Sequence, residues 1–207
     1  MAHIPDGVLS APVLIGGGAL ALAGLAIGLR RLDETDIPKT AILAAVFFTA
    51  SLVSVPVGPS SVHLLLAGLM GLVLGVRAVP AVFVGLLLQA VFFGFGGLTS
   101  LGVDVVDIAF PGMLLGLATR PLLARTTSTT AVAAIAAAVA VLSVAGTTAC
   151  VAAALALSSA DYLPSLRIVV LTALPLAVVE AVITGFAVSY LTAVRPDVLG
   201  LPTPQEV

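Results

Sequence analysis

The sequence predicts an all-α integral membrane protein with about seven transmembrane helices. Of its 207 residues, 60% are hydrophobic and 9% are charged, whereas an ordinary soluble domain has roughly a quarter charged residues. The apolar residues form continuous runs rich in Ala, Leu and Gly, and not the alternating pattern of a membrane β-barrel, which disfavours strands. Lys and Arg gather between alternate runs. We therefore expect one transmembrane domain over residues 1–207.

Seven apolar runs approach the roughly 20 residues that a helix needs to cross about 30 Å of hydrocarbon. Stretches containing Pro, Gly, Ser or charged residues separate them. The predicted spans are residues 11–29, 40–56, 63–76, 78–94, 107–119, 130–158 and 166–194. The third and fourth runs are short and share a tight turn, so residues 63–94 form either two spans or one re-entrant hairpin.

The cations predict the orientation, because cytoplasmic loops are enriched in Lys and Arg. With seven spans, only Arg167 falls on one side. The cations on the other side are Arg30, Arg31, Lys39, Arg77, Arg120, Arg125 and Arg195. The N-terminus is then outside, the C-terminus is inside, and residues 197–207 form a short cytoplasmic tail. This topology brings the two histidines of the chain, His3 and His63, to the external face.

The histidines predict a metal site that includes the N-terminal segment, residues 1–10. Initiator methionine is usually removed before a residue as small as Ala2, which would leave an Ala-His amino terminus. Its α-amine, the ionised amide nitrogen of His3 and the His3 imidazole Nδ1 would close five- and six-membered rings around a metal ion. The imidazole of His63 would complete a plane of four nitrogens. Ni(II) and Cu(II) favour this geometry, low-spin Co(II) can adopt it, and tetrahedral zinc is poorly served by it.

Two alternatives to this ligand set remain open. If Met1 is retained, the amine, two amides and the His3 imidazole would bind the ion, and His63 would be superfluous or axial. In addition, a histidine near a membrane surface is more often solvated or hydrogen-bonded than bound to a metal. His3 would then be hydrogen-bonded within a segment that closes the external end of the bundle.

Three stretches within residues 1–120 carry a family resemblance. They are HIPDGVLS, VPVGPSSVHLLLAGLMGLVLG and LLQAVFFGFGGLTSLGVDVVDIAFPG. These stretches resemble the CbiM/NikM family, the substrate-binding membrane subunits of energy-coupling-factor cobalt and nickel importers. The resemblance implies a metal held by the terminal amine, by the amide and imidazole of the N-terminal histidine, and by a later histidine. Those positions are Ala2 after processing, His3 and His63.

The sequence departs from the family pattern at three positions. Family members usually begin Met-His, so Ala2 fits only after Met1 is removed. The glycine-rich loop commonly reads Gly-Asp-Gly-Gly, but Phe95 takes the aspartate place here, and Asp104 stands where asparagine is usual. The local charge is similar, yet the exchange argues against assigning a ligand or gating role to that loop.

Two polar residues inside the predicted spans have alternative roles. Gln89 is expected to hydrogen-bond between helices, or else to lie beside the metal. Glu180 falls near the middle of the seventh span, where an ionised carboxylate is costly, so it is expected to be protonated or to face the interior. Both roles are compatible with transport.

Several function classes lack the residues that they need. There is no GxxxxGK[ST] phosphate loop, so we expect no nucleotide bound by this chain. No Ser–His, paired-carboxylate or HExxH arrangement predicts an enzyme. No run of basic residues predicts nucleic-acid binding. Two other functions remain as alternatives. One is a self-sufficient secondary metal transporter or channel, and the other is a membrane haem protein with both histidines as axial ligands.

The expected function is metal capture for an ATP-dependent energy-coupling-factor importer of Co²⁺ or Ni²⁺. Both ions suit an all-nitrogen site, so the sequence does not choose between them. The resemblance implies a membrane scaffold (T) subunit, paired ATPase subunits and a small accessory membrane subunit as partners. The expected location is the plasma (inner) membrane of a prokaryote, where the chain crosses the lipid bilayer several times.

Overall fold

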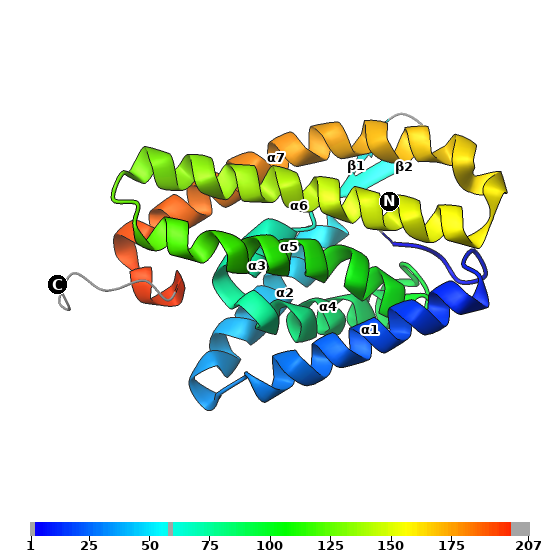
Figure 1. The fold of residues 1–207 in the computed structure, drawn as a ribbon, viewed down its shortest axis with the longest axis horizontal. Coiled ribbons are helices and arrows are strands. Elements are labelled where there is room, and N and C mark those ends of the chain that lie inside the picture. The colour runs from blue at the N-terminus through cyan, green and yellow to red at the C-terminus, as the bar shows by residue number, and fades with distance from the viewer. Residues whose placement is uncertain (1–2, 58–59, 200–207) are drawn as a thin grey trace.

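The computed structural model describes residues 3–57 and 60–199, and this part of the chain forms a bundle of helices (Figure 1). Its α-helices are α1 (Ala11–Arg30), α2 (Ile37–Leu52), α3 (Ala67–Leu74), α4 (Ala78–Phe93), α5 (Leu101–Ala124), α6 (Thr129–Ser158) and α7 (Leu166–Val194). Short 3₁₀ helices lie at Glu34–Asp36, Gly75–Arg77, Ala160–Ser165 and Pro196–Leu199. Strands β1 (Ser54–Val57) and β2 (Ser60–His63) form an antiparallel hairpin that pairs Ser54 with His63.

The prediction of an all-α membrane protein with about seven helices is confirmed. By length and composition, six segments of the described chain are suited to cross a membrane; one of them, Ala67–Phe93, comprises α3, the following 3₁₀ turn and α4, which do not form a single straight helix. The small β-hairpin lies outside these segments. The orientation of the bundle in the membrane stays a prediction.

Residues 63–94 form a helical hairpin with one short arm. The turn at Gly75, with a φ of 58°, is followed by Arg77, which pairs with Asp36 just before α2. The two ends of this stretch are both near His3, because the His3 ring stacks on His63 and Gly96 lies beside His3. The stretch therefore enters and leaves at the same end of the bundle. Because α3 has 8 residues and α4 has 16, the two arms have unequal lengths.

Three predicted spans have the wrong limits. The prediction 63–76 begins too early, because His63 still belongs to β2 and α3 starts only at Ala67. The prediction 40–56 ends too late: α2 stops at Leu52, and residues 54–57 form β1, where Pro56 cannot continue a helix. The prediction 107–119 is too short at both ends, because α5 runs from Leu101 to Ala124 through two prolines. Near its C-terminal end, the Arg120 side chain donates to Val73 O of α3 at 3.4 Å, so this cation is accommodated against the neighbouring helix.

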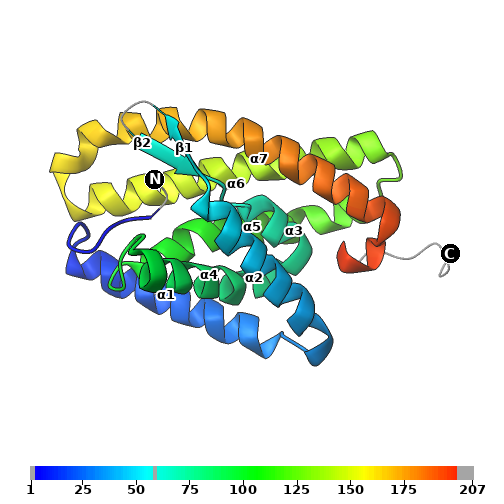
Figure 2. The ribbon, with the colours of Figure 1, turned by 180° about the vertical axis from the view of Figure 1, so that it is seen from behind.

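The buried centre of the bundle is built around α3. Every residue of α3 is buried, and the helix lies between α5, α6 and α7 (Figure 2). Glycines allow this close packing: a Cβ added to Gly71 would lie 1.8 Å from Gly112 O, and one added to Gly116 would lie 2.3 Å from Gly71 C. Close backbone contacts with α5 therefore hold the short helix α3 in place.

The cations predicted to share a face do gather at one end of the bundle. Lys39 Nζ lies 3.3 Å from Asp36 Oδ1 and donates to Val198 O at 3.3 Å. The α1–α2 connection, the α5–α6 connection and the C-terminal end of the described chain share this end, whereas the β-hairpin and the α6–α7 connection lie at the other (Figure 1). Of the predicted tail, residues 197–199 belong to a 3₁₀ helix, and residues 200–207 lie outside the described chain.

Candidate metal site

The structure brings the two predicted histidine ligands together. His63 ends β2, and His3 lies in the irregular segment before α1. Their ring centroids are 4.6 Å apart and the ring planes differ by 15°. This separation leaves no room for a porphyrin between the rings, which argues against haem ligation by this pair. The predicted ligand Ala2 lies outside the described residues.

Both imidazoles are in the neutral form that binds metals. Burial, helped by the neighbouring His63, lowers the pKa of His3 to about 3. Burial also lowers the pKa of His63 below its usual value of 6.5. A neutral imidazole has one nitrogen with a free lone pair. The pair therefore needs no deprotonation at neutral pH before it binds a cation.

Each ring has a nitrogen without a hydrogen-bond partner. Within the described part of the chain, Nε2 of His3 and Nε2 of His63 are buried and unpartnered. Buried polar atoms in folded proteins are normally hydrogen-bonded, so each exception requires an explanation. For His63 the simplest explanation is a ligand bound at Nε2, and the adjacent ring of His3 can bind the same ligand through its own lone-pair nitrogen.

The protonation pattern of His63 follows from its neighbour. His63 Nδ1 lies 3.2 Å from Leu64 O. A carbonyl oxygen can only accept, so Nδ1 must be the donor and must carry the proton. Nε2 is then the nitrogen with the free lone pair, and it is the nitrogen that His63 can offer to a metal ion.

Two carboxylates hold the N-terminal segment in place. Ile4 N donates to Asp104 Oδ1 at 3.0 Å. Asp6 accepts from Leu98 N at 3.2 Å and from Thr99 N at 2.9 Å. The Thr99 hydroxyl also donates to Asp6 and is the main reason that the pKa of this carboxyl lies below its usual range. The loop after α4 is therefore a binding surface for the N-terminal segment.

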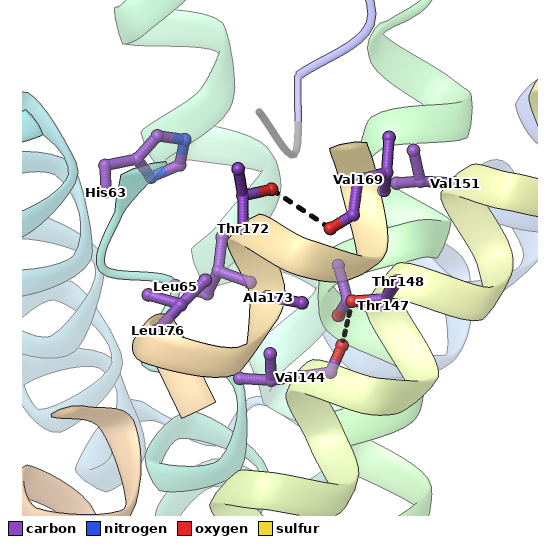
Figure 3. A pocket seen from close by; sticks show the side chains of 10 residues that line it. All are labelled: His63, Leu65, Val144, Thr147, Thr148, Val151, Val169, Thr172, Ala173 and Leu176. Carbon is purple, nitrogen blue, oxygen red and sulfur yellow. Dashed lines mark hydrogen bonds between the residues drawn. The ribbon is translucent and has the colours of Figure 1, made fainter. Parts of the chain in front are cut away.

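A cavity of about 30 Å³ lies beside His63 (Figure 3). Thr147 and Thr148 of α6 and Thr172 of α7 contribute hydroxyl groups to its lining. Thr147 Oγ1 is buried and has no hydrogen-bond partner among the described residues. A cavity of this size is large enough for one water molecule. His63 is therefore bordered by a small cavity between α6 and α7 whose lining is mainly apolar and includes these three hydroxyl-bearing residues.

The other residues considered from the sequence have separate roles. Gln89 Nε2 donates to Ser51 Oγ, so Gln89 forms the predicted hydrogen bond between helices α4 and α2. Phe95 is 45% exposed and stacks on Phe93 with a centroid distance of 5.9 Å. Glu180 faces the interior, as one of its two expected alternatives required, and is 1% exposed.

Some positioning contacts could not be found from the sequence. The Asp6 contacts to the loop after α4 and the Ile4–Asp104 contact join residues about 100 positions apart. The only available signal was that Asp6 and the glycine-rich loop belong to recognisable motifs. Within residues 3–57 and 60–199, no group of three or more His, Cys, Asp and Glu side chains could hold a metal ion. A metal ion at the histidine pair would therefore need additional ligands that are not side chains of this kind from the described residues.

Comparisons with known proteins agree with this architecture. Residues 3–198 match the family model CbiM, the cobalt uptake substrate-specific transmembrane region. A putative metal transport protein of Haemophilus influenzae is 35% identical over 95% of this chain and 96% of its own length. The cobalt transport protein CbiM of Sorangium cellulosum is 34% identical over 95% of this chain and 94% of its own.

Two further similarities extend the comparison. A fused nickel transport protein, NikMN, of Rhodobacter capsulatus is 33% identical over 59% of this chain and 37% of its own length. A crystal structure of a truncated transition metal transporter has a TM-score of 0.72 and 26% identity, and the match covers 92% of this chain and 98% of that one. The chain therefore belongs to the CbiM family of cobalt uptake transmembrane proteins.

Proposed function

We propose that this protein captures a divalent transition-metal ion at the His3–His63 pair for import across the membrane. The observation that carries the proposal is the pair itself: two adjacent, buried, neutral imidazoles, with the lone-pair nitrogen of His63, Nε2, lacking a partner among the described residues. Relatives include cobalt and nickel transport proteins. Co²⁺ or Ni²⁺ is accordingly the proposed cargo.

The remaining ligands come from the chain terminus. The mature chain begins at Ala2, and its α-amine, the His3 amide nitrogen and His3 Nδ1 chelate the ion, while His63 Nε2 fills the fourth position. With metal–nitrogen distances of about 2 Å, neighbouring imidazoles on a planar ion have ring centroids on the order of 4–5 Å apart. The observed 4.6 Å separation falls in this range. The rings are stacked with planes only 15° apart, so one ring must turn before both lone pairs point at the same ion.

Metal titration of the purified full chain tests the capture role. His63→Ala is expected to lower the affinity for Ni²⁺ by more than about 100-fold, because it removes a ligand, whereas loss of an outer contact typically costs 10–100-fold. Thr172→Val is the matched control, since Thr172 lines the same cavity but donates to Ile168 O. Equal Ni²⁺ affinity in wild type and His63→Ala would exclude His63 as a ligand.

The protein is proposed to act as the metal-capture subunit of an energy-coupling-factor importer in a prokaryotic plasma membrane. Its sequence has no phosphate-binding loop, so energy must come from paired ATPase subunits through a membrane scaffold (T) subunit, with a small accessory membrane subunit. High-rate uptake is expected only when these partners are co-expressed. Robust ATP-independent accumulation by the purified chain in liposomes would instead establish a secondary transporter.

A further inference from the structure

Glu180 is a buried carboxyl group in the middle of α7 that the proposed ligand set does not use. Its Oε1 accepts from Leu65 N at 2.5 Å and from Leu66 N at 2.8 Å. These N–H groups stand at the entry of α3, where Leu66 is the N-cap residue and makes no side-chain capping hydrogen bond. N–H groups at a helix start have no partner within the helix. Glu180 therefore supplies, from α7, the acceptor that the entry of α3 lacks.

One peptide unit joins Glu180 to His63. The N–H of the peptide between Leu64 and Leu65 donates to Glu180 Oε1, and the C=O of the same peptide accepts from His63 Nδ1. A peptide unit is planar and rigid. A partner that fixes its N–H therefore also fixes its carbonyl oxygen. The position of Glu180 is in this way transmitted to the imidazole ring.

The backbone at this point needs such an anchor. Leu66 has a φ of 49°, a left-handed conformation that is uncommon for residues other than glycine. Two consecutive N–H groups that converge on one oxygen form the concave arrangement that binds anionic groups. The strained conformation persists because surrounding contacts hold it. Glu180 provides the polar part of those contacts.

We propose that Glu180 is a positioning residue for metal capture. Acting through the Leu64–Leu65 peptide, it holds His63 with Nδ1 protonated and with Nε2 free for the metal ion. This inference rests on the proposed function. Hydrogen-bond partners behind a ligating histidine are typically worth 10–100-fold in metal affinity. Because Glu180 acts through an intervening peptide, we expect about tenfold, the lower end of that range.

Two variants separate the length of the side chain from its charge. Glu180→Gln keeps the length and the acceptor oxygen, whereas Glu180→Asp keeps the acid group but withdraws it from the peptide by one methylene. Thr184→Val is the matched control, because Thr184 lies one turn further along α7, is fully buried and has an unpartnered hydroxyl within the described chain. All variants are made in the full-length chain in lipid nanodiscs.

Two measurements are made on each variant. The first is ¹⁵N NMR of the metal-free protein, which reports which His63 nitrogen carries the proton. The second is titration with Ni²⁺. We expect wild type, Glu180→Gln and Thr184→Val to keep Nδ1 protonated and to agree in affinity within about threefold. Glu180→Asp should show a mixture of tautomers and about tenfold weaker binding.

The proposal is overturned if Glu180→Asp matches wild type in both measurements. It is also overturned if Glu180→Gln loses as much Ni²⁺ affinity as Glu180→Asp. Failure of the proposed function looks different: His63→Ala would then bind Ni²⁺ as tightly as wild type. The tautomer measurement needs no metal ion, so it tests the link from Glu180 to His63 independently of metal binding.

Discussion

At the scale of single residues, each side chain at the site is held by a partner that is distant in the sequence. His3 faces His63, and Ile4 and Asp6 attach the segment around His3 to Asp104 and to the loop after α4. The segment before α1 has no regular secondary structure, so contacts of this kind, together with the burial of Ile4 and Leu9 in an apolar cluster, determine its position. Any ligand that His3 shares with His63 therefore depends on them.

Gly97 provides a test of this dependence. A Cβ added to Gly97 would lie 2.0 Å from Asp6 Oδ1 and 2.7 Å from Asp6 N. Gly97→Ala should therefore displace the N-terminal segment and weaken Ni²⁺ binding by at least about tenfold, comparable to loss of an outer contact, without changing the helical content. Gly94→Asn is the control, because Gly94 has free space around it and Asn tolerates its positive φ. An equal loss of Ni²⁺ affinity in both variants would show that displacement of the N-terminal segment is not the cause.

Acid should release the N-terminal segment of the metal-free protein. The pKa values of His3 and His63 are lower in the folded protein than the usual 6.5. Their stabilising contribution is thus complete above pH 6.5 and is lost as the pH falls below it. The equilibrium constant for release of the segment should increase by up to about tenfold per pH unit for each imidazole that takes up a proton. Asp6, whose pKa is lowered from 3.8, adds to this effect only at more acidic pH.

Hydrogen exchange at the Ile4 amide measures this release, because that N–H is buried against Asp104. Its protection factor, corrected for the intrinsic exchange rate, should fall between pH 7 and pH 5. His3→Ala should show a shallower fall, since one of the two titrating rings is missing. A protection factor that is constant over this range in wild type would refute the coupling.

The residue scale also shows what the sequence could predict about the site. The number of crossings, counted from the apolar runs, placed His3 and His63 on one face, and the positions of the cations predicted that this face is external. The contacts of Asp6, Asp104 and Glu180 were not predictable, because each joins positions about 90 to 115 residues apart and leaves no local pattern. Metal binding by His3 and His63 stays a prediction, and so does chelation by the α-amine of Ala2, which lies outside the described residues.

At the scale of elements, the hairpin of α3 and α4 decides where the site lies. Its short arm, α3, begins inside the bundle. Residues 64–66, which join β2 to α3, therefore place His63 at the edge of the interior. The sequence left two alternatives for residues 63–94 because both arms are almost entirely apolar. Hydrophobic periodicity could not distinguish two spans from one re-entrant hairpin. In the structure, the turn at Gly75 divides this apolar stretch into α3 and α4.

The crossing of α3 and α5 should not tolerate even a methyl group. A Cβ on Gly71 would lie 1.8 Å from the backbone oxygen of Gly112. Gly71→Ala is therefore expected to destabilise the fold by at least about 1–3 kcal/mol, the usual cost of overpacking. Gly18→Ala is the control, because nothing lies within 4 Å of a Cβ at Gly18. Thermal unfolding in detergent compares them, and an unchanged Tm for Gly71→Ala would contradict the packing.

At the scale of the whole molecule, the bundle is polarised. The histidine pair lies at one end, and most of the cations lie at the other. This arrangement agrees with a metal site on the external face and a cation-rich cytoplasmic face. The helical membrane fold was predictable from composition and from continuous apolar runs. The ends of α2 and α5 were not, because prolines and charges within an apolar segment can either end a helix or be accommodated in it.

Cysteine labelling tests the predicted orientation. In a Cys150→Ala background, which removes the single native cysteine, Asp33→Cys should not react with a membrane-impermeant reagent added to intact cells. Asp161→Cys, in the 3₁₀ helix before α7, should react, because it lies at the opposite end of the bundle. The reverse pattern would place the histidine pair on the cytoplasmic side.

Ni²⁺ binding to chains with altered termini tests the central proposal most directly. Three purified full-length proteins are compared with wild type: His3→Ala, His63→Ala, and a chain that retains one additional residue before Ala2, verified by mass spectrometry. The additional residue moves the amine out of its five-membered ring while leaving both histidines in place. We expect one Ni²⁺ per wild-type chain and strongly weakened binding in His3→Ala and His63→Ala. The chain with the additional residue should still bind Ni²⁺ through its amine, two amides and the His3 imidazole, but its affinity should no longer depend on His63. Undiminished affinity in both His3→Ala and His63→Ala would contradict the proposal.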